Sequence, residues 1–186
     1  MSETLQTILQ RRSIRSYKQE QIKDSELQAI IEAGRFAPSA RNQQSWHFTV
    51  VQNQALLSRI NKILQVVFLH SGDPLLEERA KAENFSPFYH APTLIIVSAD
   101  EKAIAPQADA SLALGNLLLA AHALGVGSCW IHSLRFLFST KEGRALNKEL
   151  GIPAGYTIVG SGAFGYHAGE APAAAPRREG TVTIIK

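Results

Sequence analysis

Three arginines and a serine lie within five residues near the start of the chain, at Arg11, Arg12, Ser13 and Arg15. Such a concentration of like charge is unfavourable unless an anion lies among the side chains. Arginine offers planar, bidentate donors that match phosphate oxygens, and a serine hydroxyl adds a neutral donor that approaches closely. The segment therefore predicts a phosphate-binding site.

A second polar segment, residues 37–46, has a proline near its start and side-chain amides further on. Pro38 predicts the end of the preceding helix, and Asn42, Gln43 and Gln44 follow it closely. An amide both donates and accepts hydrogen bonds, as the polar edge of a flat heterocycle requires. A phosphate site and an amide-lined edge together indicate a phosphorylated heteroaromatic ligand, and flavin mononucleotide (FMN) is the one we expect.

The composition limits the possible classes of protein. The chain has 186 residues, 45% of them hydrophobic, which predicts a single domain over residues 1–186. Its net charge of +3 is too small an excess for the long basic stripe of a nucleic-acid-binding protein. The most apolar run, residues 112–126, is shorter than the roughly 20 residues that span a bilayer. The N-terminus lacks the pattern of a secretory signal, so we expect a cytoplasmic protein that binds neither nucleic acid nor membranes.

Side chains that could catalyse a reaction by themselves are scarce. The six histidines show neither the HExxH spacing nor the His–Cys pairing of a metal site, so no metal is expected. Cys129 is the only cysteine, which excludes an intrachain disulfide, and we expect it to be a small core residue. No carboxylate pair or Ser–His–Asp arrangement is recognisable, so we expect no catalytic side chain and assign the chemistry to the cofactor.

Helices and strands are predicted to alternate around these segments. A short helix with Leu5, Ile8 and Leu9 on one face ends at the arginines, and a second begins at a capping box in Ser25–Gln28 and ends before Pro38. The other expected elements are strands at residues 47–52, 91–99, 128–131 and 156–164, and helices at residues 55–68, 77–83, 108–124 and 139–150. The polar stretch from 71 to 87 is a candidate lid.

Two features point to a partner subunit. The helix at residues 108–124 is apolar nearly all round, and such a helix must be buried, which in a small domain suggests a subunit interface. Residues 168–186 form an arm, which consists of a connector rich in alanine and proline, then Arg177 and Arg178, then a strand-like stretch at 181–185. An isolated strand commonly pairs with the sheet edge of a neighbour, so we expect this arm to reach the partner.

Five segments, in a consistent order, resemble the nitroreductase family of FMN enzymes. They are RRSIRSY at 11–17, APSARNQQSW at 37–46, HAPTLIIV at 90–97, DASLALGNLLLAAHALGVGSCWI at 109–131 and PRR at 176–178. The likeness covers nearly the whole chain and departs from the family pattern at Ser45, where proline is usual. It implies an α+β fold with a mixed, mainly antiparallel central sheet flanked by helices, in an intertwined homodimer with FMN at the interface.

The resemblance also implies roles for individual residues. Those that correspond to phosphate and ribityl contacts of the family are Arg11, Arg12, Ser13, Arg15 and Arg177. Those that correspond to flavin contacts made from the partner subunit are Pro38, Ser39, Asn42 and, less closely, Gln44. Those that correspond to the segment whose backbone lies along the flavin ring near N5 are Trp130, Ile131 and His132.

The activity that the resemblance implies is reduction of nitroaromatic or quinone-like acceptors with NAD(P)H, by ping-pong hydride transfer through flavin N5. Two alternatives stay open at this point. One is a flavoenzyme of the same fold with other chemistry, such as a dehydrogenase or a reductive dehalogenase. The other is a non-catalytic flavin-binding protein.

Overall fold

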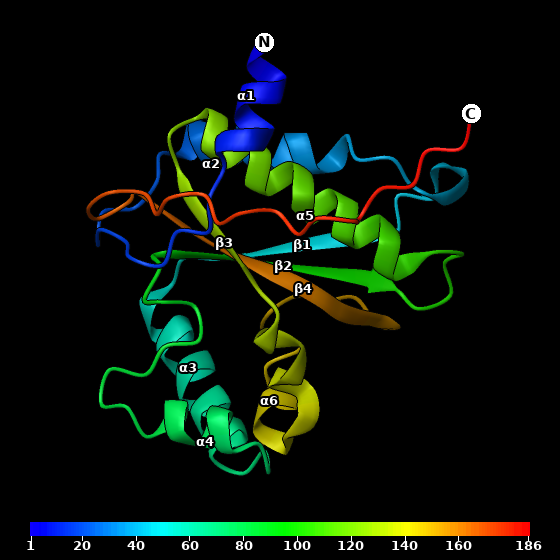
Figure 1. Ribbon diagram of the computed structural model, residues 1–186. Coiled ribbons are helices and arrows are strands. Elements are labelled where there is room, and N and C mark those ends of the chain that lie inside the picture. Colours follow the sequence, from blue (N-terminus) through cyan, green and yellow to red (C-terminus); the bar gives the residue numbers. More distant parts are fainter.

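A central sheet between two layers of helices organises the chain, which a computed structural model describes over all 186 residues (Figure 1). The strands are β1 (Trp46–Val51), β2 (Thr93–Asp100), β3 (Gly127–Ile131) and β4 (Tyr156–Gly165). The helices are α1 (Glu3–Gln10), α2 (Asp24–Arg35), α3 (Gln54–Leu69), α4 (Pro74–Ala80), α5 (Pro106–Ala123) and α6 (Lys141–Ala145), with the 3-10 helices η1 (Ala40–Asn42) and η2 (Ser133–Ser139). The predicted α+β class is confirmed.

The sheet is built around β2. Its strand order is β1-β2-β4-β3, and all neighbouring strands are antiparallel. Successive side chains of a strand point to opposite faces, and in the central part of β2, Leu94–Val97, both sets are apolar and fully buried. Leu94 and Ile96 join one hydrophobic cluster, whereas Ile95 and Val97 join the other. The sheet therefore needs a helical layer on each face.

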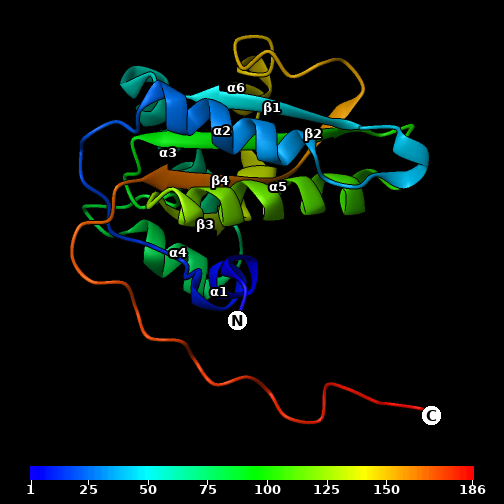
Figure 2. The ribbon, with the colours of Figure 1, turned by 90° about the horizontal axis from the view of Figure 1, so that it is seen from above.

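Helices α2 and α5 cover one face of the sheet and lie side by side across it (Figure 2). The Asn116 side chain of α5 donates a hydrogen bond to the Ala33 carbonyl of α2 at 3.0 Å. Gly34 permits this close approach, because a Cβ atom there would lie 2.6 Å from Leu117 Cδ2. The predicted burial of α5 is confirmed for most of its apolar positions, although Leu112 stays about half exposed at 49%.

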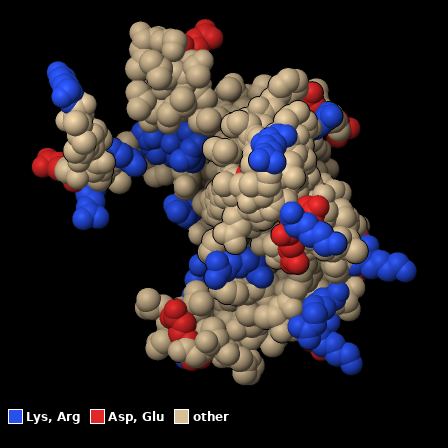
Figure 3. Space-filling view, turned by 90° about the vertical axis from the view of Figure 1, so that its right-hand side faces the viewer, with Lys and Arg blue, Asp and Glu red and all other residues tan.

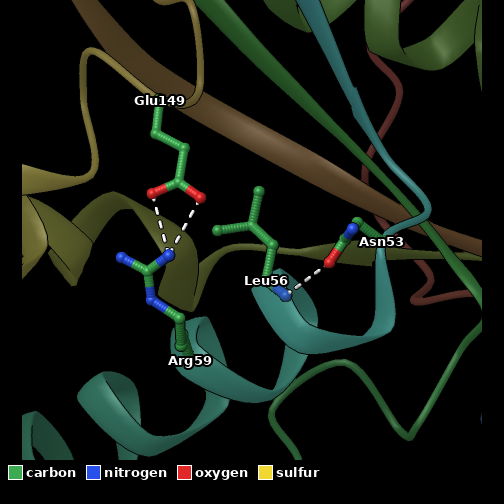
Figure 4. A network of polar contacts seen from close by, with 4 residues as sticks. All are labelled: Asn53, Leu56, Arg59 and Glu149. Atoms are coloured by element: carbon green, nitrogen blue, oxygen red, sulfur yellow. Dashed lines mark hydrogen bonds and ion pairs between the residues drawn. The ribbon is translucent and has the colours of Figure 1, made fainter.

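Helices α3, α4 and α6 cover the opposite face. Asn53 caps α3 by accepting a hydrogen bond from the Leu56 N–H at 2.9 Å (Figure 4). Arg59 Nη1 lies 2.9 Å from both carboxylate oxygens of Glu149, which joins α3 to the segment after α6. An exposed pair of this kind contributes at most about 1 kcal/mol, so the hydrophobic cluster beneath it provides most of the attachment.

Several predicted boundaries differ from those observed. Helix α2 begins at Asp24, ahead of the predicted capping box, and Glu26 accepts a hydrogen bond from the Lys23 N–H at 3.0 Å. Helix α6 ends at Ala145 rather than near residue 150, because the chain turns at Leu146. The candidate lid is also less open than expected, since residues 85–88 are buried.

The arm at the C-terminus lies away from the body of the molecule (Figure 2). Residues 169–186 contain no helix or strand, so the predicted strand at 181–185 does not form within a single chain. Val182, Ile184 and Ile185 are each more than 70% exposed. The apolar face of α1 is similarly open, and none of its residues is buried. Two apolar surfaces thus lack a covering element.

No helix combines the length and the apolar character needed to cross a bilayer.

The loop between α2 and β1 is held by a buried carboxylate. Asp109, in the first turn of α5, is 2% exposed. Its Oδ1 accepts a hydrogen bond from the Ala40 N–H, and its Oδ2 accepts one from the Ser45 hydroxyl, both at 3.0 Å. The interaction fixes residues 40–45 to the N-terminal end of α5.

We expect Asp109→Ala to lower the free energy of unfolding by about 2–4 kcal/mol, because one buried and one partly buried donor lose their acceptor. Chemical denaturation measures the change. The control is Asp109→Asn, which keeps one carbonyl acceptor and should cost less. An Asp109→Ala protein within about 0.5 kcal/mol of the wild type would show that the loop does not depend on this anchor.

Candidate functional site

The arginine segment lies along the start of β3. Helix α1 ends at Gln10, and the chain then runs beside the strand, where the Ile14 N–H donates to the Ser128 carbonyl at 2.9 Å. Ser13 forms an isolated parallel bridge with Ser128. The backbone between the arginines is therefore fixed to the edge of the sheet.

None of the three arginines has a carboxylate partner. The ion pairs of the structure join other residues, so neither Arg11, which is partly buried, nor Arg15 is compensated. Arg12 differs from them, because its Nη1 donates to the carbonyls of Leu9 and Arg11, each at 2.7 Å. Arg12 thus satisfies acceptors at the end of α1. Arg11 and Arg15 are the arginines best suited to bind an anion.

Arg15 packs against an aromatic ring. Its guanidinium carbon lies 5.8 Å from the centroid of the Tyr89 ring, and interaction with the Tyr89 side chain raises the pKa of Arg15. Close by, burial raises the pKa of the Cys129 thiol, although Arg15 acts in the opposite direction. Cys129 is 3% exposed. A buried thiol with a raised pKa is a poor nucleophile, which agrees with the core position expected for it.

Trp130, Ile131 and His132 lie at the other end of β3. The Ser161 hydroxyl donates to the Ile131 carbonyl at 2.8 Å and so fixes the backbone there. Arg135 Nη1 donates to His132 Nε2 at 2.9 Å, which requires a neutral imidazole with its proton on Nδ1. A hollow of about 360 Å³ adjoins them, and its lining includes Trp130, His132 and Arg135.

Arg135 was not among the predicted site residues. It lies three residues after His132, within η2, and that spacing brings two side chains of a helical turn together. The spacing was readable in the sequence, but the turn itself was not. A glycine also makes room here, since a Cβ atom on Gly160 would lie 2.8 Å from the Trp130 ring.

The length of β3 separates the two groups of site residues. The strand has five residues, and at about 3.3 Å per residue it spans roughly 16 Å. The arginine segment therefore begins beside its start, and the segment expected beside the ring stands at its end. This spacing suits an elongated ligand with a phosphate at one end and a flat ring at the other.

The loop after α2 presents its amides from a strained backbone. Arg41, Asn42 and Gln44 have positive φ angles of 51°, 54° and 48°. Each such residue costs about 1–3 kcal/mol and persists only where its surroundings hold it. Ser39 Oγ accepts from the Gln44 N–H at 2.9 Å, and the Gln44 side chain donates to Asn42 Oδ1 at 3.1 Å. Strain of this kind is common where a side chain is held for binding.

A single chain does not bring this loop to the arginine segment. The loop is attached to Asp109 at the first turn of α5, and the arginine segment lies at the other end of the helix (Figure 2). There, burial and the nearby Arg11 and Arg12 lower the pKa of His122, in the last turn of α5. Helix α5 has 18 residues and so is about 27 Å long. The two halves of the predicted site stand at opposite ends of α5.

The arm does not complete the site within one chain either. No hydrogen bond or ion pair joins Arg177 to the arginine segment, and Arg177 is exposed. Figure 3 shows Lys and Arg side chains along the hollowed left side of the view, where acidic side chains are few. This side of the molecule is suited to an anionic ligand.

A larger apolar cavity of about 440 Å³ lies between α3, the start of α4 and η2. Phe68, Leu76 and Phe136 line it, and none of the predicted site residues does. Its Thr140 hydroxyl already accepts a hydrogen bond from the Gly143 N–H at 3.0 Å. The candidate functional site is therefore the region of the arginine segment and β3, where the predicted site residues lie, rather than the larger cavity.

Comparisons with known proteins identify the family of this chain. The model of the family described as "Nitroreductase family" matches residues 8–166. A nitroreductase from Bacteroides fragilis, solved with bound FMN, is 40% identical, and the match covers 100% of both chains with a TM-score of 0.94. A nitroreductase from Desulfitobacterium hafniense, also solved with bound FMN, is 29% identical over 100% of both chains with a TM-score of 0.92.

A relative from Archaeoglobus fulgidus, named "Putative NADH dehydrogenase/NAD(P)H nitroreductase", is 33% identical over 173 residues. The match covers 89% of this chain and 86% of the relative. The family match itself takes in the arginine segment, the loop after α2 and all of β3. The family expected from the sequence is thus confirmed: this chain belongs to the nitroreductase family.

Proposed function

We propose that this protein is an FMN-dependent oxidoreductase that uses NAD(P)H to reduce nitroaromatic or quinone-like acceptors. The observation that carries the proposal is the presence of two uncompensated guanidinium groups, Arg11 and Arg15, at the start of β3. Membership of the nitroreductase family supports it, as do the relatives solved with bound FMN and the relative named for NAD(P)H.

The side chains present fit FMN. Arg11, Ser13 and Arg15 would hold the phosphate and the ribityl chain, and the fixed backbone at Ile131 and His132 would meet the ring. When bound, FMN supplies the hydride-transfer chemistry through its N5, which is why no catalytic side chain is needed. Cations and backbone N–H groups at such a site stabilise negative charge that develops during reduction.

A homodimer would complete the site. The loop of residues 38–44 cannot reach the arginine segment of its own chain, but a two-fold axis can bring it to that of the partner. The apolar residues Leu5, Ile8 and Leu9 of α1 are each about half exposed and would be covered in such an assembly. The arm at 168–186 would extend to the partner's sheet, where β1 has a free edge.

We also propose that residues 1–186 form one domain, because a single sheet separates its two main hydrophobic clusters. The one cysteine makes no disulfide, which is compatible with the cytoplasmic location that we propose.

Anaerobic half-reactions test the activity. The purified holo-protein should lose its visible flavin absorption when mixed with NADH or NADPH, and a quinone or nitroaromatic should restore it. Double-reciprocal plots of the steady-state rate at several acceptor concentrations should give parallel lines, since NAD(P)H and the acceptor would occupy the same face of the flavin in turn. A bound flavin that neither nucleotide reduces would reject NAD(P)H as the donor and favour a flavoenzyme with other chemistry.

Arg11→Ala should weaken FMN binding by about ten- to a hundredfold, because a charge-assisted hydrogen bond of roughly 1.5–3 kcal/mol is lost. Titration of flavin fluorescence measures the affinity. The matched control is Arg12→Ala, which should have a smaller effect because Arg12 already donates to two carbonyls. Equal losses in the two variants would contradict the distinction drawn between these arginines.

Deletion of residues 180–186 should weaken dimerisation and FMN binding together, because the arm is expected to hold the partner at the site. Analytical ultracentrifugation and flavin content measure the two effects. Arg177→Ala provides a control, since it should reduce FMN affinity while leaving the dimer intact. A full-length holo-protein that is monomeric at micromolar concentration would exclude the interface site.

A further inference from the structure

Two arginines from distant parts of the chain meet at the ring of Tyr89. Arg15 approaches it from the segment along β3, with its guanidinium carbon 5.8 Å from the ring centroid. Arg79 approaches it from the last turn of α4, at 5.7 Å. Only Arg15 belongs to the proposed flavin site, so Arg79 brings an additional cation to the border of that site.

Arg79 has no ionic partner, although acidic residues are close in sequence. On the same segment, Lys81 Nζ pairs with Glu78 at 3.1 Å, and Glu77 accepts a hydrogen bond from the Gly72 N–H at 3.0 Å. Arg79 is exposed and takes part in no ion pair. Its charge is therefore available to a ligand.

The ring between the two arginines is held by a strained turn. Tyr89 and His90 have consecutive positive φ angles of 58° and 54°. The Tyr89 N–H donates to the Ser86 carbonyl at 3.2 Å, and the His90 N–H donates to the Ser86 hydroxyl at 2.9 Å. Phe88, which precedes them, is buried. A conformation this costly persists because its surroundings fix it, and the Tyr89 side chain packs against the larger hydrophobic cluster.

A guanidinium that lies over an aromatic ring can still bind a ligand. The attraction to the ring is electrostatic and requires none of the N–H donors, which lie in the plane of the group. Those donors match the two oxygens of a carboxylate or of a phosphate. Tyr89 would thus limit the motion of Arg79 without using its hydrogen-bonding capacity.

We propose that Arg79 is a specificity-determining residue that binds an oxyanion on the substrate that meets the flavin. The proposal rests on the function proposed above. The oxyanion would be the carboxylate of an aromatic acceptor or the extra phosphate by which NADPH differs from NADH. Both share the chemistry that a stacked arginine recognises, and the two sources are separated by experiment.

Equilibrium binding to the oxidised holo-protein tests the proposal without turnover. Benzoate and benzamide have nearly the same shape and differ in charge, and NADP⁺ and NAD⁺ differ by one phosphate. Perturbation of the visible flavin spectrum reports each dissociation constant. In Arg79→Gln, the constant for benzoate or for NADP⁺ should rise about tenfold, as expected for loss of one charge-assisted contact. Those for benzamide and NAD⁺ should change less than about twofold.

The matched control is Lys81→Gln, which removes one positive charge from the same segment at an ammonium already paired with Glu78. It should leave all four constants unchanged. A selective effect on benzoate identifies an acceptor carboxylate, and one on NADP⁺ identifies the donor phosphate. The proposal is overturned if Arg79→Gln changes neither the benzoate-to-benzamide nor the NADP⁺-to-NAD⁺ ratio of dissociation constants, or if Lys81→Gln has the same effect. A wild-type protein without bound flavin would instead reject the proposed function itself.

Discussion

Burial of β2 on both faces is the constraint on which the rest of the structure depends. Alternate side chains of this strand enter two separate hydrophobic clusters, so each face of the sheet must carry its own helices. The requirement places α5 across one face and α3 across the other. β4, which pairs with β2, then presents β3 at the edge of the sheet. The arginine segment can lie along β3 only because that edge is open.

Unfavourable local features are concentrated in a few places on this frame. All the non-glycine residues with positive φ lie in two turns, Arg41–Gln44 and Tyr89–His90. Both turns adjoin segments to which a binding role is assigned, and both are fixed to the core by hydrogen bonds. The arginines to which a binding role is assigned, Arg11, Arg15 and Arg79, likewise lack carboxylate partners. A rigid core with surplus stability can maintain such features where a ligand later offsets them.

Much of the fold was predictable because its elements carry strong periodic signals. The alternating faces of β2 and the apolar α5 follow directly from residue type, and the four strands lie within two residues of their expected limits. Helix ends were less predictable. Lys23 is not a residue that normally marks an N-cap, and the end of α6 depends on a turn at Leu146 that no glycine or proline announces.

The candidate site likewise has features that the sequence predicts and features that it does not. Its charged and amide residues stand out in the sequence by type and spacing, and their binding roles remain predictions. The contacts of Asp109 and Tyr89 were missed, since they join segments far apart in the sequence, and periodicity contains no information about such pairings. The contacts of Arg12 and Arg79 are more local, to carbonyls at the end of α1 and to a ring ten residues away. They depend on side-chain conformations and on a turn that residue type and spacing do not specify.

The two halves of the predicted site lie at opposite ends of α5, so the length of this helix sets the distance between them in the assembly. One inserted residue would lengthen it by about 1.5 Å and rotate one end against the other by about 100°. In the proposed dimer, the insertion would displace residues of both sites. Each site would combine residues near the start of α5 in one protomer with residues near the end of α5 in its partner. Insertions and deletions should therefore be tolerated in exposed turns such as residues 70–73 and selected against between Asp109 and His122.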